Sequence, residues 1–386
     1  DWSSDVCSSD LYTDDANFKK LNYGKLMIMT DADNDGTHIK GLILNLIHHL
    51  FPSLLRRKES FVCDMLTPIV KISHGTSSRL FYSEDLFHDF MNSEEASKKN
   101  YKVKYYKGLG TSSDAEVKET FGKKVLDFTY DKFENVDENM NKIFSNKSAD
   151  KRKDWLANFD ETFRYPAAEG NERLITDFID HDLIKFSLDD CGRSIPNIFD
   201  GLKESQRKIL YGAFLKNLSP NGKPIKVAQF SGFIAEKTNY HHGEQCLSST
   251  ITSMAQNFPG SNNVPFFTRD GQFGSRLHGG KDAASPRYIF TKLEKLTRYL
   301  FPAEDDQLLN YVIDDGDKVQ PEYYLPIIPT ILINGCTAGI GTGWSCSIPC
   351  FNPMDVITNV RIYINNKKNE KADEYTEDRK STRLNS

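Results

Sequence analysis

The alternation of apolar and polar positions divides the chain into a mixed first part and a helix-rich second part. Over residues 12–125, strand-like runs such as "KLMIMTD", "LTPIVKIS" and "KVKYYKG" alternate with helix-like runs, which predicts an α/β fold. Residues 126–175 are strongly charged and predict helices and connectors. Residues 176–312 predict helices punctuated by glycine, and "VQPEYYLPIIPTILING" beyond residue 313 predicts strands. The pattern therefore predicts several domains, α/β first and α+β afterwards.

The two ends differ from the rest of the chain. Residues 1–11, "DWSSDVCSSDL", and residues 378–386, "DRKSTRLNS", can be encoded by opposite strands of one oligonucleotide. Two unrelated protein ends should not share one piece of DNA, so we interpret both as translated sequencing-adaptor sequence and exclude them from the fold. The natural part is then expected to run from about residue 12 to about residue 377, truncated at both ends.

Composition narrows the class of protein. A hydrophobic content of 38% and a charged content of 27% are ordinary for a soluble globular chain. No apolar run approaches the ~20 residues that span a bilayer, so no membrane partner is expected. The cysteines outside the first end show no zinc spacing, which favours reduced intracellular thiols. The net charge of -5 argues weakly against a nucleic-acid partner, yet residues 200–230 carry six basic and only two acidic residues, a stretch suited to phosphates.

Alternating aspartates stand out in "IMTDADNDGTHIKG", residues 28–41. An EF-hand would need a glutamate at loop position 12, where this chain has Leu42, and a helix upstream, where it has a strand-like run. Asp31, Asp33 and Asp35 instead follow a predicted buried strand and precede a helix, where α/β sheets bind ligands. Close carboxylates need a neutralising cation, and oxygen-only donors suit Mg²⁺. The alternative is a solvated acidic turn that caps the next helix.

A second turn with small residues occurs in "YYKGLGTSSDAEVKETF". Lys107, Gly108 and Gly110 lie between a predicted strand and a helix whose N-cap is Ser113 or Asp114. Backbone amides and a lysine in such a turn can approach phosphate closely. An ordinary turn and cap would explain the same residues.

A basic amphipathic helix is predicted in "NIFDGLKESQRKILYGAFLKN", with Asp200 as its candidate N-cap. Lys203 and Arg207 are four residues apart and share one face, as in a helix that docks on a nucleic-acid duplex. An ordinary surface helix is the alternative. The following "NYHHGEQCL" places His241 and His242 together without a metal-binding spacing, which suits proton transfer or phosphate contact.

The stretch "GQFGSRLHGGKDAASPRYIFT" is the densest candidate for chemistry. It resembles a P-loop, but the spacing is off by one and Asp282 follows Lys281, so ATP binding here is not supported. Arg287 stands beside Tyr288, and phosphoryl transfer to a protein oxygen needs a nucleophile and a cation. Taken alone, such a pair is more often structural.

Together these motifs resemble those of eukaryotic type IIA DNA topoisomerases, and they stand in the same order. The matching stretches also include "TPIVK", "AQNFPGSNN", "PIIPTILING" and "GIGTGWSCSIP", and they cover most of residues 21–360. The family cuts both strands of one duplex, passes another duplex through and reseals the first. The resemblance implies part of a Rossmann-like TOPRIM domain over 12–125, a helical connector over 126–175, a winged-helix domain with the catalytic tyrosine over 176–312 and the start of a tower domain over 313–377.

The resemblance also implies roles for single residues. Tyr288 corresponds to the nucleophile that forms a 5'-phosphotyrosyl bond, Arg287 to the group that stabilises the transition state, and His242 to an imidazole near the scissile phosphate. Asp31 and Asp33 correspond to Mg²⁺ ligands, with Asp35 the third acid of the motif. With Lys107 and Arg207 from the patterns above, the expected DNA contacts are Lys107, Arg152, Lys153, Lys203, Arg207, Tyr240, Cys246 and Ile340, the last as an apolar wedge between base pairs.

Two departures from the family pattern affect these expectations. The family's E-G-D motif does not occur upstream of the aspartates, so the metal site lacks an expected glutamate. The family's ATP-hydrolysing domain is not in this chain. The resemblance further implies double-stranded DNA as partner, a homodimer in which the tyrosine of one subunit meets the metal of the other, and a nuclear location. A viral or bacterial type IIA enzyme and a catalytically silent DNA-bending module remain as alternatives.

Overall fold

A computed structural model describes residues 12, 15–97, 99–106, 108–131, 133–160, 171–240, 242–314 and 316–368. The two terminal segments interpreted as adaptor sequence, together with Lys107 and His241, lie outside these described residues. The chain separates into two compact units, Asp1–Asp190 and Cys191–Ser386. Among the described helices, none combines the length and the apolar character that crossing a bilayer requires.

The first unit is built on a mixed four-stranded sheet in the order β1-β2-β6-β7. The pairs β1–β2 and β6–β7 are parallel, and β2 and β6 are antiparallel. Its strands are β1 (Leu26–Ile28), β2 (Val62–Met65), β6 (Val125–Thr129) and β7 (Glu172–Leu174). β6 begins at residue 125, the expected end of the α/β part, and β7 lies within the predicted connector. This sheet therefore extends past the expected boundary.

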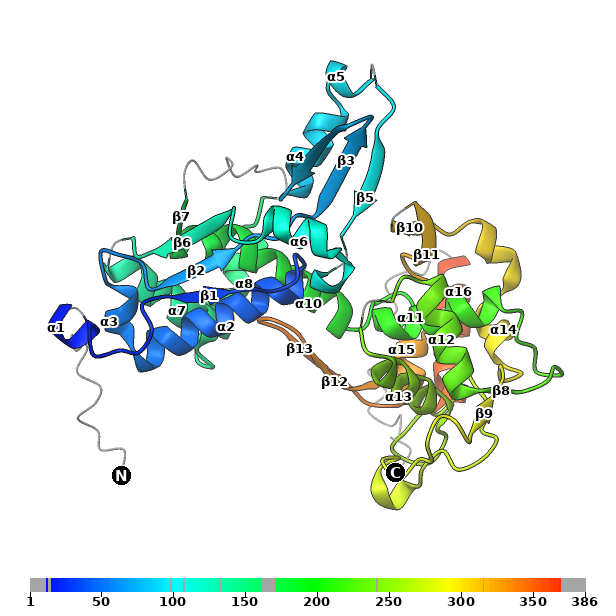
Figure 1. The fold of residues 1–386 in the computed structure, drawn as a ribbon. Helices are drawn as coiled ribbons and strands as arrows, with labels where there is room; N and C mark the ends of the chain where they lie inside the picture. The colour runs from blue at the N-terminus through cyan, green and yellow to red at the C-terminus, as the bar shows by residue number, and fades with distance from the viewer. Residues whose placement is uncertain are drawn as a thin grey trace. The chain divides into compact units, whose positions relative to one another are not determined.

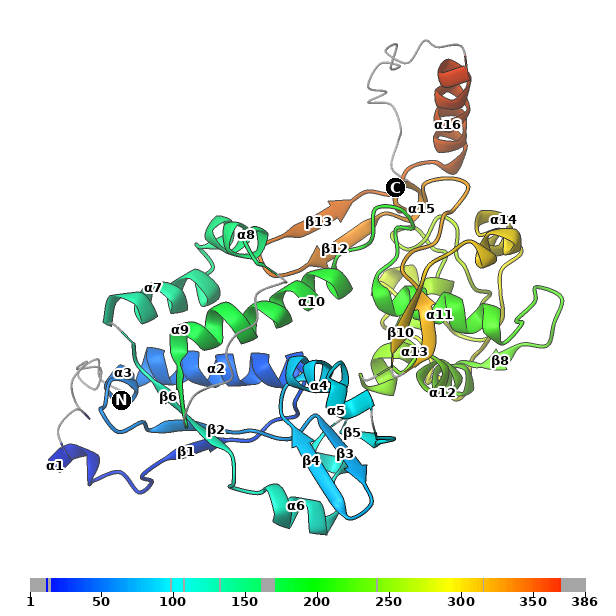
Figure 2. The same cartoon turned by 90° about the horizontal axis from the view of Figure 1, so that it is seen from above.

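Helix α2 (Asn34–Leu50) joins β1 to β2 and packs on the sheet, as the helix-like run after the aspartates predicted. Figure 2 shows α2 between the strands and the helical run α9–η3–α10, which covers Ile175–Asp177, Phe178–Leu183 and Ile184–Ser194. Ile28, Leu44 and Phe128 are buried in the core between these layers. The expectation of a buried first strand holds only for Ile28: β1 lies at the edge of the described sheet, and Leu26 and Met27 are exposed.

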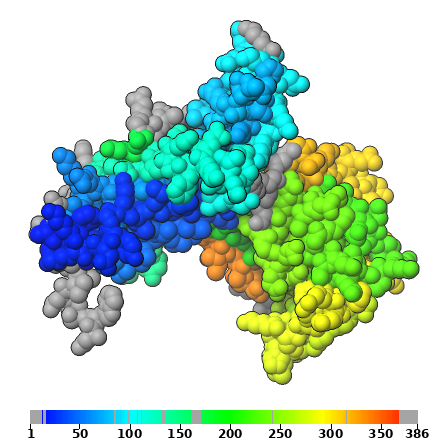
Figure 3. Space-filling model, in the orientation of Figure 1, coloured from blue at the N-terminus to red at the C-terminus, as the bar shows by residue number. Residues whose placement is uncertain are grey.

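A smaller lobe of the first unit interrupts the sheet between β2 and β6. It contains the antiparallel sheet β4-β3-β5, of Ser77–Phe81, Val70–His74 and Lys102–Tyr105, with α4 (Glu84–Met91) and α5 (Glu94–Ser97). Val70, Phe81 and Phe87 belong to a core of its own. Figures 1 and 3 show the lobe standing out from the rest of the unit, in cyan.

The charged stretch after β6 forms two helices, as its pattern predicted. They are α7 (Phe133–Phe144) and α8 (Ala149–Ala157). The apolar side chains Val136 and Met140 of α7 complete the core under α2, which leaves the charged face of α7 outward.

Three helices form the centre of the second unit. They are α11 (Glu204–Leu215), α12 (Val227–Lys237) and α13 (Glu244–Ala255). Their apolar faces meet around Phe230, Ile234 and Ile251, all fully buried. A short antiparallel pair, β8 (Ile225–Lys226) with β9 (Phe290–Thr291), lies at the start of α12. This helical centre agrees with the pattern predicted for residues 176–312.

The remainder of the unit carries hairpins and a terminal helix. The expectation of strands throughout "VQPEYYLPIIPTILING" was wrong, because Thr330–Asn334 form the helix α15 after Pro329. The short apolar run after Pro329 has no decisive periodicity, so its pattern alone does not separate a strand from a helical turn. Figure 2 shows the long hairpin β12–β13 beside α15; the other elements are β10 (Tyr311–Asp314), β11 (Asp317–Pro321), β12 (Cys336–Ile340), β13 (Ser345–Ile348) and α16 (Pro353–Lys368).

Candidate functional site

Tyr288 lies on a segment clamped to the start of α12. Ala228 N–H donates to the carbonyl of Pro286 at 3.1 Å, and Val227 N–H donates to the carbonyl of Ile289 at 3.0 Å. These bonds fix the backbone on both sides of the tyrosine, whose side chain is 71% exposed. The guanidinium of Arg287 lies 5.8 Å from the centre of the tyrosine ring. A rigid scaffold therefore presents a phenol with a cation beside it, as the sequence predicted.

The glycines before the tyrosine serve packing. A Cβ on Gly274 would lie 2.5 Å from the carbonyl oxygen of Gly280, and Gly280 itself has a φ of +81°. The Gln256 amide donates to the carbonyls of Phe273 at 2.8 Å and of Gly280 at 3.2 Å. The resemblance of this stretch to a P-loop thus has a structural cause, which is the close approach of two backbone segments.

Three of the predicted residues meet at the start of α13. The rings of Tyr240 and His242 are 5.3 Å apart and nearly perpendicular. Burial, followed by a hydrogen bond with the thiol of Cys246, raises the pKa of Tyr240 well above its ordinary value. The thiol of Cys246, predicted only as a DNA contact, thus has the hydroxyl of Tyr240 as a partner.

The basic face predicted for α11 does not exist in that form. Arg207 is buried, and its guanidinium binds the carboxylate of Asp200 through Nε to Oδ2 at 2.6 Å and Nη2 to Oδ1 at 3.1 Å. Lys208 is also buried, and burial lowers the pKa of its amine. The expectation that Arg207 faces DNA was wrong, because an arginine that lies next to a buried aspartate pairs inward.

Asp200 is likewise not the N-cap of α11, which is Lys203. The carboxylate of Asp200 is fully buried and also accepts the backbone N–H of Leu202 at 2.9 Å and of Tyr324 at 3.0 Å. Its backbone carbonyl accepts the hydroxyl of Thr330 at 2.5 Å. Asp200 therefore joins the start of α11 to residues more than a hundred positions later.

Lys203, at the start of α11, is bound to the β12–β13 hairpin that carries Ile340. The amine of Lys203 donates to the carbonyl of Ala338 at 2.9 Å, two residues before Ile340. The side chain of Ile340 is 70% exposed. A projecting hairpin with an exposed apolar residue beside a lysine is suited to an apolar insertion into a phosphate-lined groove.

Arg152 and Lys153 on α8 have local partners. The Nη1 of Arg152 donates to the carbonyls of Lys142, Ile143 and Ser145 at 3.2, 3.1 and 2.6 Å, which caps the end of α7. Lys153 is half exposed and pairs with Asp150 at 2.9 Å, one turn earlier. The contact that the structure shows for Arg152 is thus structural, whereas Lys153 remains on the surface.

The aspartates after β1 are tied to backbone amides. Asp33 is the N-cap of α2, and its Oδ1 accepts Gly36 N–H at 2.6 Å, so the capping alternative holds for this residue. Asp31 Oδ1 accepts the N–H of Leu109, 78 residues away, at 2.7 Å. Asp35 lies in the first turn of α2, where the helix dipole favours a negative charge. Among the described residues, no three acidic, histidine or cysteine side chains are grouped to hold a metal ion.

Gly108 and Leu109 therefore form one side of this acidic turn. A Cβ on Gly108 would lie 3.1 to 3.3 Å from the carboxylate atoms of Asp31, which is tighter than an ordinary contact, so glycine eases the close approach of the two segments. The sequence placed Gly108 at a phosphate-binding turn and did not connect it with Asp31. No local signal relates the two segments, because their contact is made across the fold.

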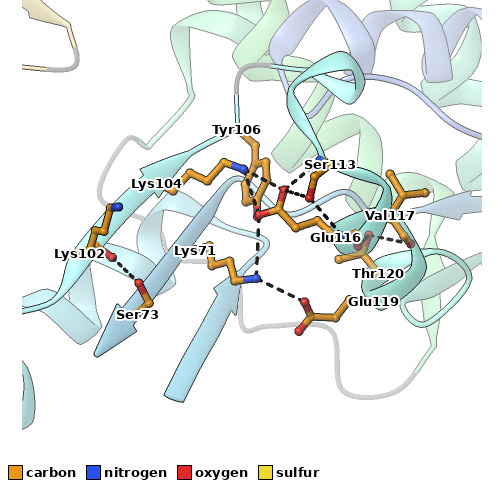
Figure 4. Close-up of polar contacts among 10 residues, drawn as sticks. All are labelled: Lys71, Ser73, Lys102, Lys104, Tyr106, Ser113, Glu116, Val117, Glu119 and Thr120. Atoms are coloured by element: carbon orange, nitrogen blue, oxygen red, sulfur yellow. Dashed lines mark hydrogen bonds and ion pairs between the residues drawn. The ribbon is translucent and has the colours of Figure 1, made fainter. Parts of the chain in front are cut away.

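Glu116 anchors the helix that follows this turn (Figure 4). It forms a capping box with Ser113 at the start of α6 (Asp114–Thr120), confirming one of the two predicted N-caps. Lys104 donates to both carboxylate oxygens of Glu116 at 2.9 and 2.8 Å, and the hydroxyl of Tyr106 donates at 2.8 Å. The hydrogen bond from Lys104, then those from Ser113 and Tyr106, lower the pKa of Glu116 from its ordinary 4.5 to about 2.

We expect the Glu116→Gln variant to flatten the acid dependence of stability in this unit. A carboxyl whose pKa is depressed on folding stabilises the fold above its unfolded pKa, and that contribution is lost as the pH falls from about 4.5 toward 2. At neutral pH the loss should be about 1–2 kcal/mol, since Lys104 is partly exposed and screened. Urea unfolding measured from pH 6 to pH 2.5 would check this. Equal slopes for the variant and the unchanged chain would contradict it.

The sequence did not indicate a second charged cluster in the first unit. Asp64 on β2 is buried and pairs with Lys40 of α2 at 2.7 Å, while Arg173 pairs with Asp182 at 2.6 Å. Burial raises the pKa of Asp64, and Lys40 opposes this. The only sign of this cluster in the sequence was one acidic residue, Asp64, within the apolar run "VCDM". The first pair connects β2 to α2, and the second connects β7 to η3.

Two family models match the chain. The C-terminal associated domain of TOPRIM matches residues 65–191, and the family of the A-type subunits of DNA gyrase/topoisomerase IV matches residues 193–377. The matches change over close to the division between the two compact units.

Similar proteins extend well beyond the chain. It is 49% identical to DNA topoisomerase 2-alpha of Mus musculus over 364 residues, which are 91% of the chain and 23% of that relative. It is 48% identical to probable DNA topoisomerase 2 of Dictyostelium discoideum over 351 residues, 90% of the chain and 22% of the relative. The chain thus spans less than a quarter of these relatives' length.

A solved structure is also similar. It is the crystal structure of the Plasmodium falciparum topoisomerase II DNA-binding, cleavage and re-ligation domain, with a TM-score of 0.74 and 46% sequence identity. The likeness covers 90% of this chain and 47% of that one.

Proposed function

The chain belongs to the family of type II DNA topoisomerases, and on that premise we propose that it is the part that breaks and reseals DNA. The single observation that carries the proposal is the exposed phenol of Tyr288 on a backbone clamped by α12. In the whole enzyme, this part would cut both strands of one duplex through a covalent intermediate and reseal them after another duplex has passed. The enzyme would thereby relax supercoils and separate linked DNA.

Cleavage in this proposal is a transesterification. The Oη of Tyr288 forms a bond to a backbone phosphorus, the bond to the 3'-oxygen breaks, and the oxygen leaves with a proton. Arg287 beside the ring offsets the charge that develops on the phosphate, and His242 contributes an imidazole near it. Because one phosphodiester replaces another, the released hydroxyl can attack the phosphotyrosine and reseal the strand without further activation.

Asp31 and Asp33 are the residues that would hold Mg²⁺. Mg²⁺ is commonly held by one or two carboxylates, with waters and substrate phosphates completing its six ligands, and two aspartates at a strand end fit that requirement. When bound there, the metal would stabilise negative charge on the departing oxygen. The charge of Asp35 would then stabilise the first turn of α2 through the helix dipole. The N–H of Leu109 would orient the carboxylate of Asp31.

The fold assignments follow from the same premise. The β1–α2–β2 unit and its acidic turn support part of a TOPRIM domain, and α11–α13 with the β8–β9 pair support a winged-helix domain. The residues after 313 would begin the tower domain. We further propose a nuclear homodimer on double-stranded DNA, with ATP used by a part of the enzyme outside this chain.

The DNA contacts proposed are a reduced set. Lys203, Ile340, Tyr240 and Lys153 stay in it, because each lies on the surface or beside a surface residue of the site. Cys246 enters only through its hydrogen bond to Tyr240. Lys107, which is outside the described residues, also stays in the set.

The Gly108→Ala variant is expected to weaken Mg²⁺ binding by about tenfold, as loss of an outer-shell support does. Its new methyl would lie 3.1 to 3.3 Å from the carboxylate atoms of Asp31, which must shift to make room. Mn²⁺ titration followed by electron paramagnetic resonance measures the affinity without DNA cleavage.

Gly110→Ala is the matched control, because a Cβ at Gly110 meets nothing within 4 Å. It adds the same methyl to the same turn and should leave the Mn²⁺ affinity unchanged. Equal weakening in both variants would point to a general effect on the loop and overturn the proposed role of Gly108.

Covalent capture tests the proposed function. The chain is incubated with end-labelled duplex DNA and Mg²⁺, alone and in place of the corresponding region of a full-length relative, and then denatured. DNA that remains attached to protein supports cleavage. The exposed Ile340 on its hairpin favours one alternative, a silent DNA-bending module. DNA bending in a fluorescence energy-transfer assay, with no adduct in either context, would support that module instead.

A further inference from the structure

Two cysteines lie on neighbouring strands of the β12–β13 hairpin. In the antiparallel pairing, Gly339 lies opposite Cys346, and Cys336 lies opposite Ile348. The register shifts between Cys336 and Gly339, where β12 carries one residue more than β13. Cys336 and Cys346 are therefore diagonal neighbours next to a bulge.

The sulfur of Cys336 lies close to Gly339, the residue directly opposite Cys346. A Cβ built on Gly339 would lie 3.4 Å from the Sγ of Cys336, so this sulfur lies over the face of Gly339. Directly opposite residues of an antiparallel pair send their side chains to the same face, about 5 Å apart. The side chain of Cys346 thus emerges beside the Cys336 thiol. Burial, then the Cys336 thiol and a hydrogen bond with it, raise the pKa of Cys346.

The other nearby thiols are directed elsewhere. The thiol of Cys191 donates to the carbonyl of Thr342 at 3.2 Å, and that of Cys350 donates to the carbonyl of Asn334 at 3.0 Å. Cys336 and Cys346 are both partly exposed, so a small oxidant can reach them.

We propose that Cys336 and Cys346 form an oxidisable dithiol site, which hydrogen peroxide converts into a disulfide linking β12 to β13. One sulfur attacks a peroxide oxygen and becomes a sulfenic acid, and the other oxygen leaves as water. The second thiol then attacks the sulfenic sulfur and releases a second water. The two sulfur atoms together lose two electrons to the peroxide, and the two thiol protons end in the two waters. The bulge supplies the backbone adjustment that disulfide geometry demands.

The same hairpin carries Ile340, so the disulfide would close a loop around the exposed wedge. This consequence rests on the proposed function, and oxidation should then weaken DNA bending several-fold and reversibly. The disulfide itself is independent of that function and is tested by chemistry alone.

The test treats the full chain with hydrogen peroxide, blocks the remaining thiols with iodoacetamide and digests the protein with chymotrypsin. Cleavage after Trp344 separates Cys336 from Cys346, so a disulfide appears as a linked pair of peptides that dithiothreitol splits. We expect this pair in the unchanged chain and in the Cys191→Ser and Cys350→Ser controls. It should vanish in Cys336→Ser and in Cys346→Ser.

Three results would overturn the proposal. They are complete alkylation of both thiols after peroxide treatment, oxidation that stops at sulfinic acid, and a disulfide of Cys346 with another cysteine, seen either as a linked pair with the Cys191 peptide or as an internal bond in the peptide that holds both Cys346 and Cys350. If the disulfide forms but DNA bending is unchanged, the dithiol site stands and the proposed role of Ile340 fails. If the chain neither bends nor cleaves DNA, the proposed function fails, but the peptide analysis still shows whether the disulfide forms.

Discussion

The Tyr288→Phe variant is expected to lose covalent DNA capture by about a thousandfold or more, because no other oxygen can replace its nucleophile. The ring of Tyr288 is largely exposed, and its neighbours are held by backbone bonds to α12, so removal of one oxygen leaves the fold intact. DNA binding should therefore stay within about twofold of the unchanged chain, since phosphate contacts carry most of the affinity. Capture is measured in the chimaera with a full-length relative.

Tyr299→Phe is the matched control for this loss. Its side chain is 72% exposed, almost the same as the 71% of Tyr288, and it belongs to the same unit. The substitution removes an identical hydroxyl from a short helix, α14 (Thr297–Leu300), that has no part in the proposed site. An undiminished adduct in Tyr288→Phe, or an equal loss in Tyr299→Phe, would refute the assignment of the nucleophile.

The Arg207→Ala variant is expected to lower the free energy of unfolding of the second unit by about 3–5 kcal/mol. Truncation would leave the fully buried carboxylate of Asp200 without its guanidinium, while that carboxylate still holds the backbone of Leu202 and Tyr324. Urea unfolding monitored by tryptophan fluorescence, with Trp344 in this unit, would measure the change.

Lys203→Ala provides the contrast within the same segment. Lys203 is partly exposed and holds the β12–β13 hairpin by one bond to a carbonyl, so its loss should cost no more than about 1 kcal/mol. It should instead weaken DNA binding and reduce the salt dependence of that binding by about one unit of slope. If Arg207→Ala were fully stable and defective only in DNA binding, the buried pair would have no structural role.

Much of the local structure was predictable from residue patterns. The helix after the aspartates begins at Asn34 behind an Asp33 cap, α6 begins behind Ser113, and the charged stretch forms α7 and α8. These features depend on interactions within one or two turns, which a pattern of neighbouring residues contains. The motif around Tyr288 was recognised in the same way, since its residues are contiguous.

Long-range partners were not predictable from such patterns. Lys203 and Arg207 look equivalent on a helical face, yet Arg207 is drawn inward by Asp200 and Lys203 is not. The pairing of β6 and β7 with the first sheet also joins segments that local periodicity treats as a connector.

The sequence by itself determined which elements form locally, which family the chain resembles and which side chains can perform chemistry. The tertiary structure alone decided that Leu109 holds Asp31, that Arg207 supports the core and that Cys336 lies over Gly339 beside Cys346. The physical reason is that helices, caps and turns are selected by neighbours along the chain, whereas burial and pairing depend on which distant segments the packed core brings into contact.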